Sequence, residues 1–429
     1  MTIHEETLAT IQETIYSSVL PSGLRVFVLP KRGFAKKFAS FAVHYGSIDN
    51  RFRLSGQPEW VGVPDGIAHF LEHQLFAQEY GDAFEKFSEM GASANAFTSY
   101  HTTCYLFSAT SRFAENLDLL LDFVQTPYFT DQGTEKERGI IIQEINMYRD
   151  NPGWRLNQNL REALFVNHPF RIDIAGTAES VSQITTQLLK TCYQTFYRPN
   201  NMVVSIVGDV DPEAMVERVS KRVEGRGHPD QAIIERALVN EPEHIKEKQV
   251  VERMAVARPM FAVGFKDHRR LPEGRAVVER EFLTEIALQV LFGTASDFYN
   301  RLYEEGLIDD SFSASYYGEA SYGMTTVSGE TDDPDRVQQL MLEELQKAVE
   351  QGLAEEEVDR VRRSLYGEMV RVFDSIESLS YLINNSFFRN VSIFEYLRVL
   401  EQISLDDVNR RVREHLNPQN YAVSIIRPD

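Results

Sequence analysis

Short apolar runs rich in β-branched and aromatic residues alternate with longer stretches of helical periodicity along this chain. The apolar runs predict strands, and these cover residues 24–30, 38–45, 94–98, 103–108 and 203–207. The longer stretches predict helices, and these cover about residues 65–78, 81–89, 111–124 and 131–149. The third and fourth strands are expected to pair around a turn near Ser99. This mixture predicts an α+β protein.

The second half of the chain repeats features of the first half. Residues 260–265 are similar to 38–43, and residues 417–426 are similar to 198–207. A charged, proline-containing linker separates the halves. We therefore expect two homologous α/β-sandwich repeats, each a largely antiparallel sheet packed against helices; chance resemblance between buried strands is the alternative. The predicted boundaries are 1–225 for the N-terminal repeat, 226–247 for the linker and 248–429 for the C-terminal repeat.

Length and charge limit the number of domains and the kinds of partner that can be expected. The chain has 429 residues, too many for one ordinary hydrophobic core. Its formal net charge of −20 argues against nucleic acid as a partner, because phosphate binding needs clustered lysine and arginine. An acidic surface serves solubility first, and attraction of basic peptides is the alternative. With two cysteines, no visible secretory signal and no long apolar run, the sequence predicts a cytoplasmic protein with no membrane partner.

The candidate chemistry lies in residues 66–76. On a helix, His69 and His73 are four residues apart and share one face, where one zinc ion can bind both imidazoles. Glu72 completes a His-x-x-Glu-His arrangement and can take a proton from water activated by the metal. Asp65 is expected to be the N-cap of this helix. The apolar residues expected to pack around the site are Ile67, Phe70, Leu71 and Phe76. Two ordinary histidines on a surface or core helix are the alternative.

A zinc site with two histidines needs a third protein ligand, which is commonly a carboxylate. Glu137 and Glu144 are seven residues apart, so on a helix they lie on one face, two turns apart. Four isoleucines are expected to bury this helix: Ile140, Ile141, Ile142 and Ile145. An acid within such an apolar run is costly unless it is paired or binds a metal. The alternative is that both acids belong to a solvated stripe.

Together these motifs resemble the pitrilysin/insulinase family of inverzincin zinc peptidases, to which mitochondrial processing peptidase belongs. The resemblance is carried by residues 66–73, followed by Glu137 and Glu144. Further segments that agree with it are 94–105, 196–202 and 207–211. It covers essentially the whole chain, and the length suits the short-subunit branch, with the closest likeness to bacterial processing-protease-like proteins.

The resemblance implies a role for each residue of this site. His69, His73 and Glu144 would bind Zn2+, and Glu72 would be the general base. Glu137 would orient the site without binding the metal. The N-terminal repeat would then be catalytic, whereas the C-terminal repeat would carry no metal and would complete the substrate chamber.

The resemblance also implies a mode of substrate binding. Members of the family bind peptide as an added strand on a sheet edge, and the matching edge here is residues 94–98. Contacts from Asn95, Ala96, Phe97 and Thr98 would follow, with affinity supplied by main-chain hydrogen bonds. An ordinary turn or strand residue is the alternative for Asn95.

The C-terminal repeat departs from the family pattern. Many active members carry an arginine and a tyrosine there that reach towards the substrate carbonyl. Arg301 is near the expected arginine but out of register, so substrate binding and a surface salt bridge are both open. Asp309 or Asp310 stands where the tyrosine is expected. That leaves Tyr316, Tyr317, a partner chain or no group at all to stabilise the oxyanion.

These expectations describe a zinc-dependent endopeptidase that hydrolyses unfolded or extended peptides. The alternative is a non-catalytic scaffold subunit of a peptidase heterodimer. Two repeats make half a chamber in this family. A homodimer, or a heterodimer with a homologous inactive subunit, is therefore expected, and the sequence names neither the partner nor the physiological substrate.

Overall fold

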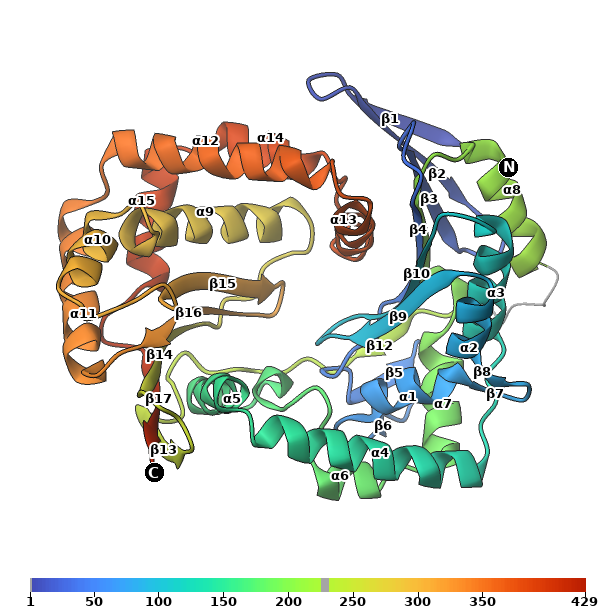
Figure 1. Ribbon diagram of the computed structural model, residues 1–429, viewed down its shortest axis with the longest axis horizontal. Coiled ribbons are helices and arrows are strands. Elements are labelled where there is room, and N and C mark those ends of the chain that lie inside the picture. The colour runs from blue at the N-terminus through green and yellow to red at the C-terminus, as the bar shows by residue number, and fades with distance from the viewer. Residues whose placement is uncertain (1, 225–230) are drawn as a thin grey trace. The chain divides into compact units, whose positions relative to one another are not determined.

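The computed structural model describes residues 2–224 and 231–429, which form two compact units (Figure 1). Unit 1 holds the described residues of Met1–Ile145, Asp173–Leu238 and Val372–Phe388. Unit 2 is made of Asn146–Ile172, Val239–Arg371 and Arg389–Asp429. Each unit therefore takes one helical segment from the other half of the sequence.

Unit 1 is built on a seven-stranded sheet in the order β1-β2-β3-β11-β4-β10-β9. Its strands are β1 (His4–Leu8), β2 (Glu13–Val19), β3 (Arg25–Pro30), β4 (Lys37–Val43), β9 (Ala92–Thr98), β10 (Thr103–Ala109) and β11 (Met202–Gly208). β3 and β11 run parallel, and the other neighbours run antiparallel. β9 pairs with β10 and lies at the sheet edge. The short strands of unit 1 are β5 (Arg51–Leu54), β6 (Val61–Gly62), β7 (Ala77–Gln78), β8 (Gly81–Asp82) and β12 (Ile234–Arg236).

Helices cover both faces of the seven-stranded sheet. The helical elements of unit 1 are α1 (Ile67–Phe76), α2 (Ala83–Glu89), α3 (Phe113–Gln125), α4 (Asp131–Arg149, whose last turn enters unit 2), α6 (Ala178–Ser182), α7 (Thr186–Phe196), η2 (Pro199–Asn201), α8 (Pro212–Val223) and α13 (Ile376–Phe388). α1, α3 and α8 pack on the face that carries Phe41 and Val204. α13 packs against β4 and β11 on the other face, where Ser40 and Ser205 lie (Figure 1).

Unit 2 is built on a five-stranded sheet in the order β13-β17-β14-β16-β15. Its strands are β13 (Gln249–Met254), β14 (Met260–Asp267), β15 (Ser313–Glu319), β16 (Tyr322–Glu330) and β17 (Ala422–Pro428). Its helical elements are α5 (Pro152–Leu164), η1 (Pro169–Arg171), α9 (Arg275–Phe292), α10 (Asp297–Glu304), α11 (Pro334–Gln351), α12 (Glu355–Val372, whose last residue belongs to unit 1), α14 (Glu395–Gln402) and α15 (Leu405–His415). α5 packs closely on β14, since a Cβ at Gly264 would lie 2.8 Å from a methyl carbon of Leu164.

The two units share one strand topology. The order β3-β11-β4-β10-β9 in unit 1 corresponds to β13-β17-β14-β16-β15 in unit 2. In both sets the first pair is parallel and the remaining pairs are antiparallel. The predicted fold class, two α/β-sandwich repeats with largely antiparallel sheets, is therefore confirmed.

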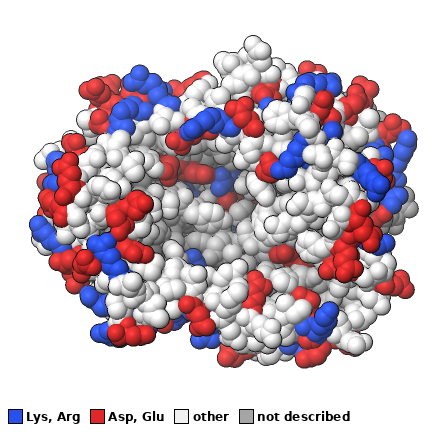
Figure 2. All heavy atoms as spheres, in the orientation of Figure 1, with Lys and Arg blue, Asp and Glu red and all other residues white. Residues whose placement is uncertain are grey.

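The distribution of charged side chains and the hydropathy of the helices can be compared with what the sequence composition indicates. Figure 2 shows acidic side chains spread over the visible face with basic ones interspersed, and no continuous basic patch on that face. Among the described residues, no helix is both long and apolar enough to cross a membrane.

Several element predictions are confirmed, and the expected N-cap is wrong. The helix predicted at 131–149 is α4, and the strands predicted at 94–98 and 103–108 are β9 and β10. α1 begins at Ile67 after Gly66, which has φ 89° and no side chain to cap the helix. Asp65 instead accepts a hydrogen bond from Asn50. A tertiary contact explains this start, because a Cβ at Gly66 would lie 2.3 Å from the carbonyl oxygen of Ala175.

The predicted repeat boundaries stay a prediction. Residues 226–230 of the expected linker lie outside the described residues. Within the rest of that segment, β12 pairs with β5 in unit 1. The units defined by contacts are not continuous in sequence, so they divide the chain by a different criterion.

Candidate metal centre

α1 carries His69, Glu72 and His73 on a helix whose apolar residues are buried. The apolar residues predicted to surround the site are all buried: Ile67, Phe70, Leu71 and Phe76. His69 and His73 lie about one helical turn apart on the same side of α1, and their ring centroids are 4.5 Å apart. Glu72 is also largely buried, with 7% of its surface exposed. The packing of the apolar face therefore fixes where all three polar groups point.

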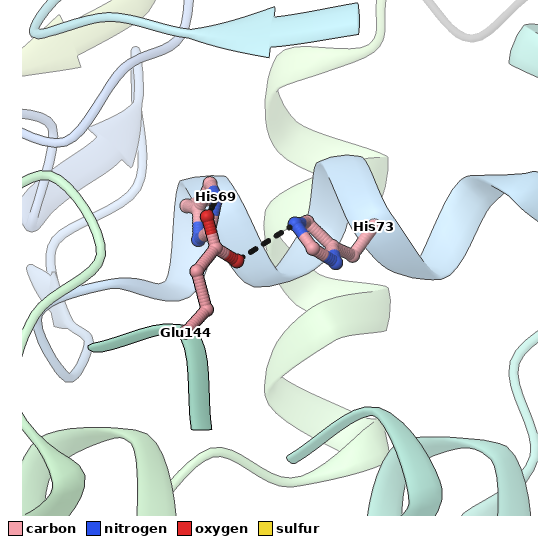
Figure 3. A group of neighbouring side chains, drawn as sticks. All are labelled: His69, His73 and Glu144. Atoms are coloured by element: carbon pink, nitrogen blue, oxygen red, sulfur yellow. Dashed lines mark ion pairs between the residues drawn. The ribbon is translucent and has the colours of Figure 1, made fainter. Parts of the chain in front are cut away.

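Glu144 of α4 faces the two histidines (Figure 3). Its Oε1 lies 3.8 Å from His69 Nε2, and its Oε2 lies 3.5 Å from His73 Nε2. One ligand atom from each residue lies within 4.8 Å of the other two. These side chains are 13–25% exposed, so the group is accessible from solvent. Two imidazoles and a carboxylate are the donor set of a catalytic zinc site with an open position.

The surroundings of Nδ1 in each imidazole show whether Nε2 is free to bind a metal ion. His73 Nδ1 lies 2.9 Å from Oε1 of Glu137, and a carboxylate there selects the tautomer that carries its proton on Nδ1. Nε2 of His73 then keeps its lone pair on the side of Glu144. His69 Nδ1 is buried and has no hydrogen-bond partner among the described residues. Its Nε2 faces the same carboxylate, so the residues fit a metal ion.

The electrostatics of the group agree with this assignment. Burial, followed by the nearby charge of His73, lowers the pKa of His69 to about 3, so its imidazole is neutral at pH 7. Burial alone would lower the pKa of His73, but the hydrogen bond to Glu137 and the neighbouring carboxylates outweigh it and raise that pKa. A group of carboxylates that attracts a proton to His73 also attracts a cation.

Glu137→Gln is expected to weaken metal binding without removing a ligand. The neutral amide oxygen can accept only a weaker hydrogen bond from Nδ1–H of His73 than the charged carboxylate does. Loss of such a supporting carboxylate costs about 10–100-fold in metal affinity or activity. Competition with a zinc chelator measures the affinity. Unchanged affinity would contradict the supporting role. Glu135→Gln on the exposed side of α4 is the matched control.

Glu72 is held by the edge strand of the sheet. Thr98 Oγ1, at the end of β9, donates a hydrogen bond of 2.7 Å to Glu72 Oε2. No described hydrogen bond engages Oε1, so that oxygen is available to accept a proton. Burial raises the pKa of Glu72, while the Thr98 hydrogen bond and His73 oppose the rise. From the sequence, Thr98 was expected only to contact the substrate. Its hydrogen bond to Glu72 is a contact between β9 and α1, and no local pattern indicates it.

Thr98→Val is expected to lower kcat by about 10-fold at nearly unchanged KM, and Thr98→Ser to restore it, because general acid–base catalysis depends on the position of the base. Zinc content should stay unchanged in both variants. Steady-state kinetics of peptide hydrolysis make the comparison. A serine variant as slow as the valine variant would show that the hydroxyl does not act through Glu72.

Comparison with known proteins shows the family to which the chain belongs. The model for insulinase, peptidase family M16, matches residues 64–178, and the model for the peptidase M16 inactive domain matches residues 183–365. An uncharacterized zinc protease of Bacillus subtilis, YmfH, is 44% identical over 418 residues, which are 97% of each chain. The chain belongs to peptidase family M16. Its recognised resemblance to the pitrilysin/insulinase family is thereby confirmed.

Other similar proteins agree with this result. A crystal structure named as an M16-like peptidase from Alicyclobacillus acidocaldarius has a TM-score of 0.94 and 35% identity, and covers 100% of this chain and 99% of that chain. The beta subunit of a probable mitochondrial-processing peptidase from Arabidopsis thaliana is 23% identical and covers 96% of this chain and 78% of the relative. A protease structure from Helicobacter pylori shares the fold, with a TM-score of 0.80, 19% identity and coverage of 96% and 99%.

The helix that carries Glu144 is less buried than the sequence predicted. Ile141 and Ile145 are buried, but Ile140 is 42% exposed and Ile142 is only partly buried. The buried residues of α4 are Thr134, Ile141 and Ile145, which lie along one stripe of the helix. The Glu144 side chain is 25% exposed and lies beside the two histidines of α1.

β9 carries the residues predicted to bind substrate, and one of them lies close to the cluster of His69, His73 and Glu144. Thr98 reaches Glu72, and Ala96 packs against the core. Asn95 is exposed, and its Oδ1 accepts a hydrogen bond from the backbone of Ala96. Phe97 points to the opposite face of the sheet from Thr98 by strand alternation. Alternate residues of β9 therefore lie on two faces of the sheet, and Thr98 lies on the face of Glu72. The substrate contacts of Asn95, Ala96, Phe97 and Thr98 stay a prediction.

The predicted groups of the second repeat all lie in unit 2. The guanidinium of Arg301 lies 5.9 Å from the centroid of the Phe298 ring, and its substrate role stays a prediction. Tyr316 donates a 3.0 Å hydrogen bond to Asp267, and burial raises its pKa, so its hydroxyl is already committed. Tyr317 is 38% exposed. The M16 inactive-domain model covers this segment.

Proposed function

We propose that this M16 chain is a zinc-dependent endopeptidase that hydrolyses unfolded or extended peptides. The observation that carries the proposal is one cluster, in which the ligand set of His69, His73 and Glu144 stands beside a buried carboxylate tied to an open sheet edge. This combination supports a site in which a zinc ion, a proton acceptor and a peptide bound at the edge of β9 would lie next to one another.

Each residue contributes one step to hydrolysis. His69, His73 and Glu144 would hold zinc, which when bound supplies a Lewis acid that acidifies water and polarises the scissile carbonyl. Glu72 would take the proton of the attacking water on its Oε1 and pass it to the leaving amine. Its raised pKa brings the carboxyl closer to neutral pH, where transfer in both directions is efficient.

The substrate class follows from the strand edge. β9 has backbone groups on its outer side that an extended peptide can pair with. A folded protein seldom offers such a segment, because its own strands are already paired. Unfolded chains and flexible peptides are therefore the proposed substrates.

The alternative is a non-catalytic scaffold subunit. An M16 inactive-domain model matches residues 183–365, whereas the proposed zinc residues lie within the insulinase match at 64–178. A chain that only completes a partner's chamber has no need of a metal group with an adjacent buried base. We therefore favour catalysis, in a homodimer or in a heterodimer with a homologous inactive subunit.

The test is hydrolysis of an unstructured peptide by the purified chain, read together with zinc content and mass in solution. We expect cleavage that stops after chelation and returns with stoichiometric zinc, and no cleavage of a stably folded protein. Activity only after addition of a second homologous chain would establish the heterodimer. A zinc-loaded chain that is inactive alone and with such partners would contradict the proposal and support the scaffold.

A further inference from the structure

Two aromatic side chains stand together beside the open edge of β9. Phe97 of β9 and Tyr381 of α13 make an edge-to-face contact, with ring centroids 5.6 Å apart and planes at 68°. Each residue is 36% exposed. Both belong to unit 1, although α13 comes from the C-terminal half of the sequence. We call these two residues the aromatic pair.

Buried polar contacts fix the helix that carries Tyr381. The adjacent residue, Ser380, places its hydroxyl 2.9 Å from that of Ser40 and 2.5 Å from that of Ser205. One turn further on, Asn384 donates a 2.8 Å hydrogen bond to the Ser40 hydroxyl. These groups are buried, so breaking the contacts would leave polar atoms unsatisfied. The Tyr381 ring therefore stands at a defined position.

A third ring supports the pair from the sheet. Phe38 of β4 meets Tyr381 edge-to-face, with centroids 6.1 Å apart, and is itself buried. The Tyr381 ring is thus bounded by Phe38 on one side and Phe97 on another. The exposed parts of Tyr381 and Phe97 form an apolar surface next to the strand edge, where an added strand would lie.

The register of the sheet shows which face of an added strand would meet this surface. Phe97 is opposite Cys104 of β10, and Cys104 Sγ lies 3.8 Å from the Asn384 amide of α13. Phe97 therefore lies on the α13 face, and its neighbour Thr98 lies on the face of Glu72. Directly opposite residues in paired strands share a face. A peptide residue opposite Phe97 would turn its side chain towards Tyr381.

We propose that the aromatic pair is a specificity site for one apolar side chain of the bound peptide. The recognised residue is the one that pairs with Phe97, and it adjoins the residue opposite Thr98, whose side chain lies on the face of the Glu72 carboxyl. Aliphatic or aromatic side chains bury their surface against Tyr381, while serine or charged ones do not. The inference rests on the proposed peptide binding at β9 and adds a substrate preference next to the cleavage point.

The first arm of the test is hydrolysis by the zinc-loaded full chain. The substrates are unstructured peptides that differ only in carrying phenylalanine or serine at each position around the cleaved bond. We expect one position adjacent to that bond at which phenylalanine raises kcat/KM by about 10-fold, the discrimination typical of an apolar contact. Tyr381→Ala should remove this preference and spare the serine peptide, while Tyr381→Phe should keep it. Tyr128→Ala, at another exposed tyrosine of unit 1, should leave all values unchanged.

The second arm measures binding, so that it stands apart from catalysis. The same labelled peptides are titrated into zinc-loaded Glu72→Gln protein, with and without Tyr381→Ala, and followed by fluorescence anisotropy. A phenylalanine preference that disappears with Tyr381→Ala supports the aromatic pair even if the chain hydrolyses nothing. Binding without any preference, or with a preference that survives Tyr381→Ala, overturns the aromatic pair while peptide binding stands. If no peptide binds, both the aromatic pair and the β9 edge are overturned.

Discussion

Glu72→Gln is expected to lower peptide hydrolysis by about 10²–10⁴-fold while zinc stays bound. The glutamine amide has nearly the same shape as the carboxylate but cannot accept a proton, and positioned proton transfer contributes a factor of this size. It can still accept the hydrogen bond that Thr98 donates to Oε2, so the local structure should persist. Steady-state kinetics with metal analysis of the same sample measure both quantities.

Glu85→Gln is the matched control, because Glu85 is an exposed acid on α2 of the same unit. It should change neither activity nor zinc content. Full activity in Glu72→Gln would remove the proton-transfer role. Loss of zinc from that variant would instead show that Glu72 acts as a ligand, in contrast to the arrangement proposed here.

Glu144→Ala is expected to lose both zinc and activity. Alanine removes the carboxylate whose two oxygens face Nε2 of His69 and Nε2 of His73, and two imidazoles alone hold zinc poorly. The affinity for zinc should fall by more than the about 10–100-fold expected from loss of a supporting residue. Chelator competition measures the affinity, and circular dichroism checks that the chain stays folded.

Glu135→Ala tests the same helix without touching the site, since the Glu135 side chain is 73% exposed. Wild-type zinc content in Glu144→Ala would show that another residue completes the site. The pair Glu72→Gln and Glu144→Ala therefore separates the base from the ligand: the first variant keeps zinc and the second does not.

Local patterns predicted the parts of the site that lie on one helix. His69, Glu72 and His73 share a face of α1 because helical periodicity alone brings them together. The bounds of α4 were predicted as well, since that helix is long and strongly helical in composition. The approach of Glu144 to the two histidines is a tertiary contact, and only the resemblance to a known family assigned Glu144 as the third ligand.

Contacts between distant segments explain what the sequence did not predict. Asp65 is a good N-cap by type, but the close approach of Ala175 to Gly66 decides how α1 begins. Tyr381 comes from the far half of the chain, and nothing near it in sequence indicates that α13 packs on the sheet that carries Phe97. Residues 146–172 pack in unit 2 and residues 372–388 pack in unit 1. This exchange was not predicted either, because neither segment carries a motif that indicates the unit in which it packs.

The most direct measurement of the central claim is anomalous diffraction at the zinc edge from crystals of the zinc-loaded chain. We expect one anomalous peak, with Nε2 of His69, Nε2 of His73 and the Glu144 carboxylate as the protein ligands, and Glu72 beside the remaining position without binding the metal. Absence of zinc at this group, or a fourth protein residue closing the coordination, would contradict a catalytic metal centre.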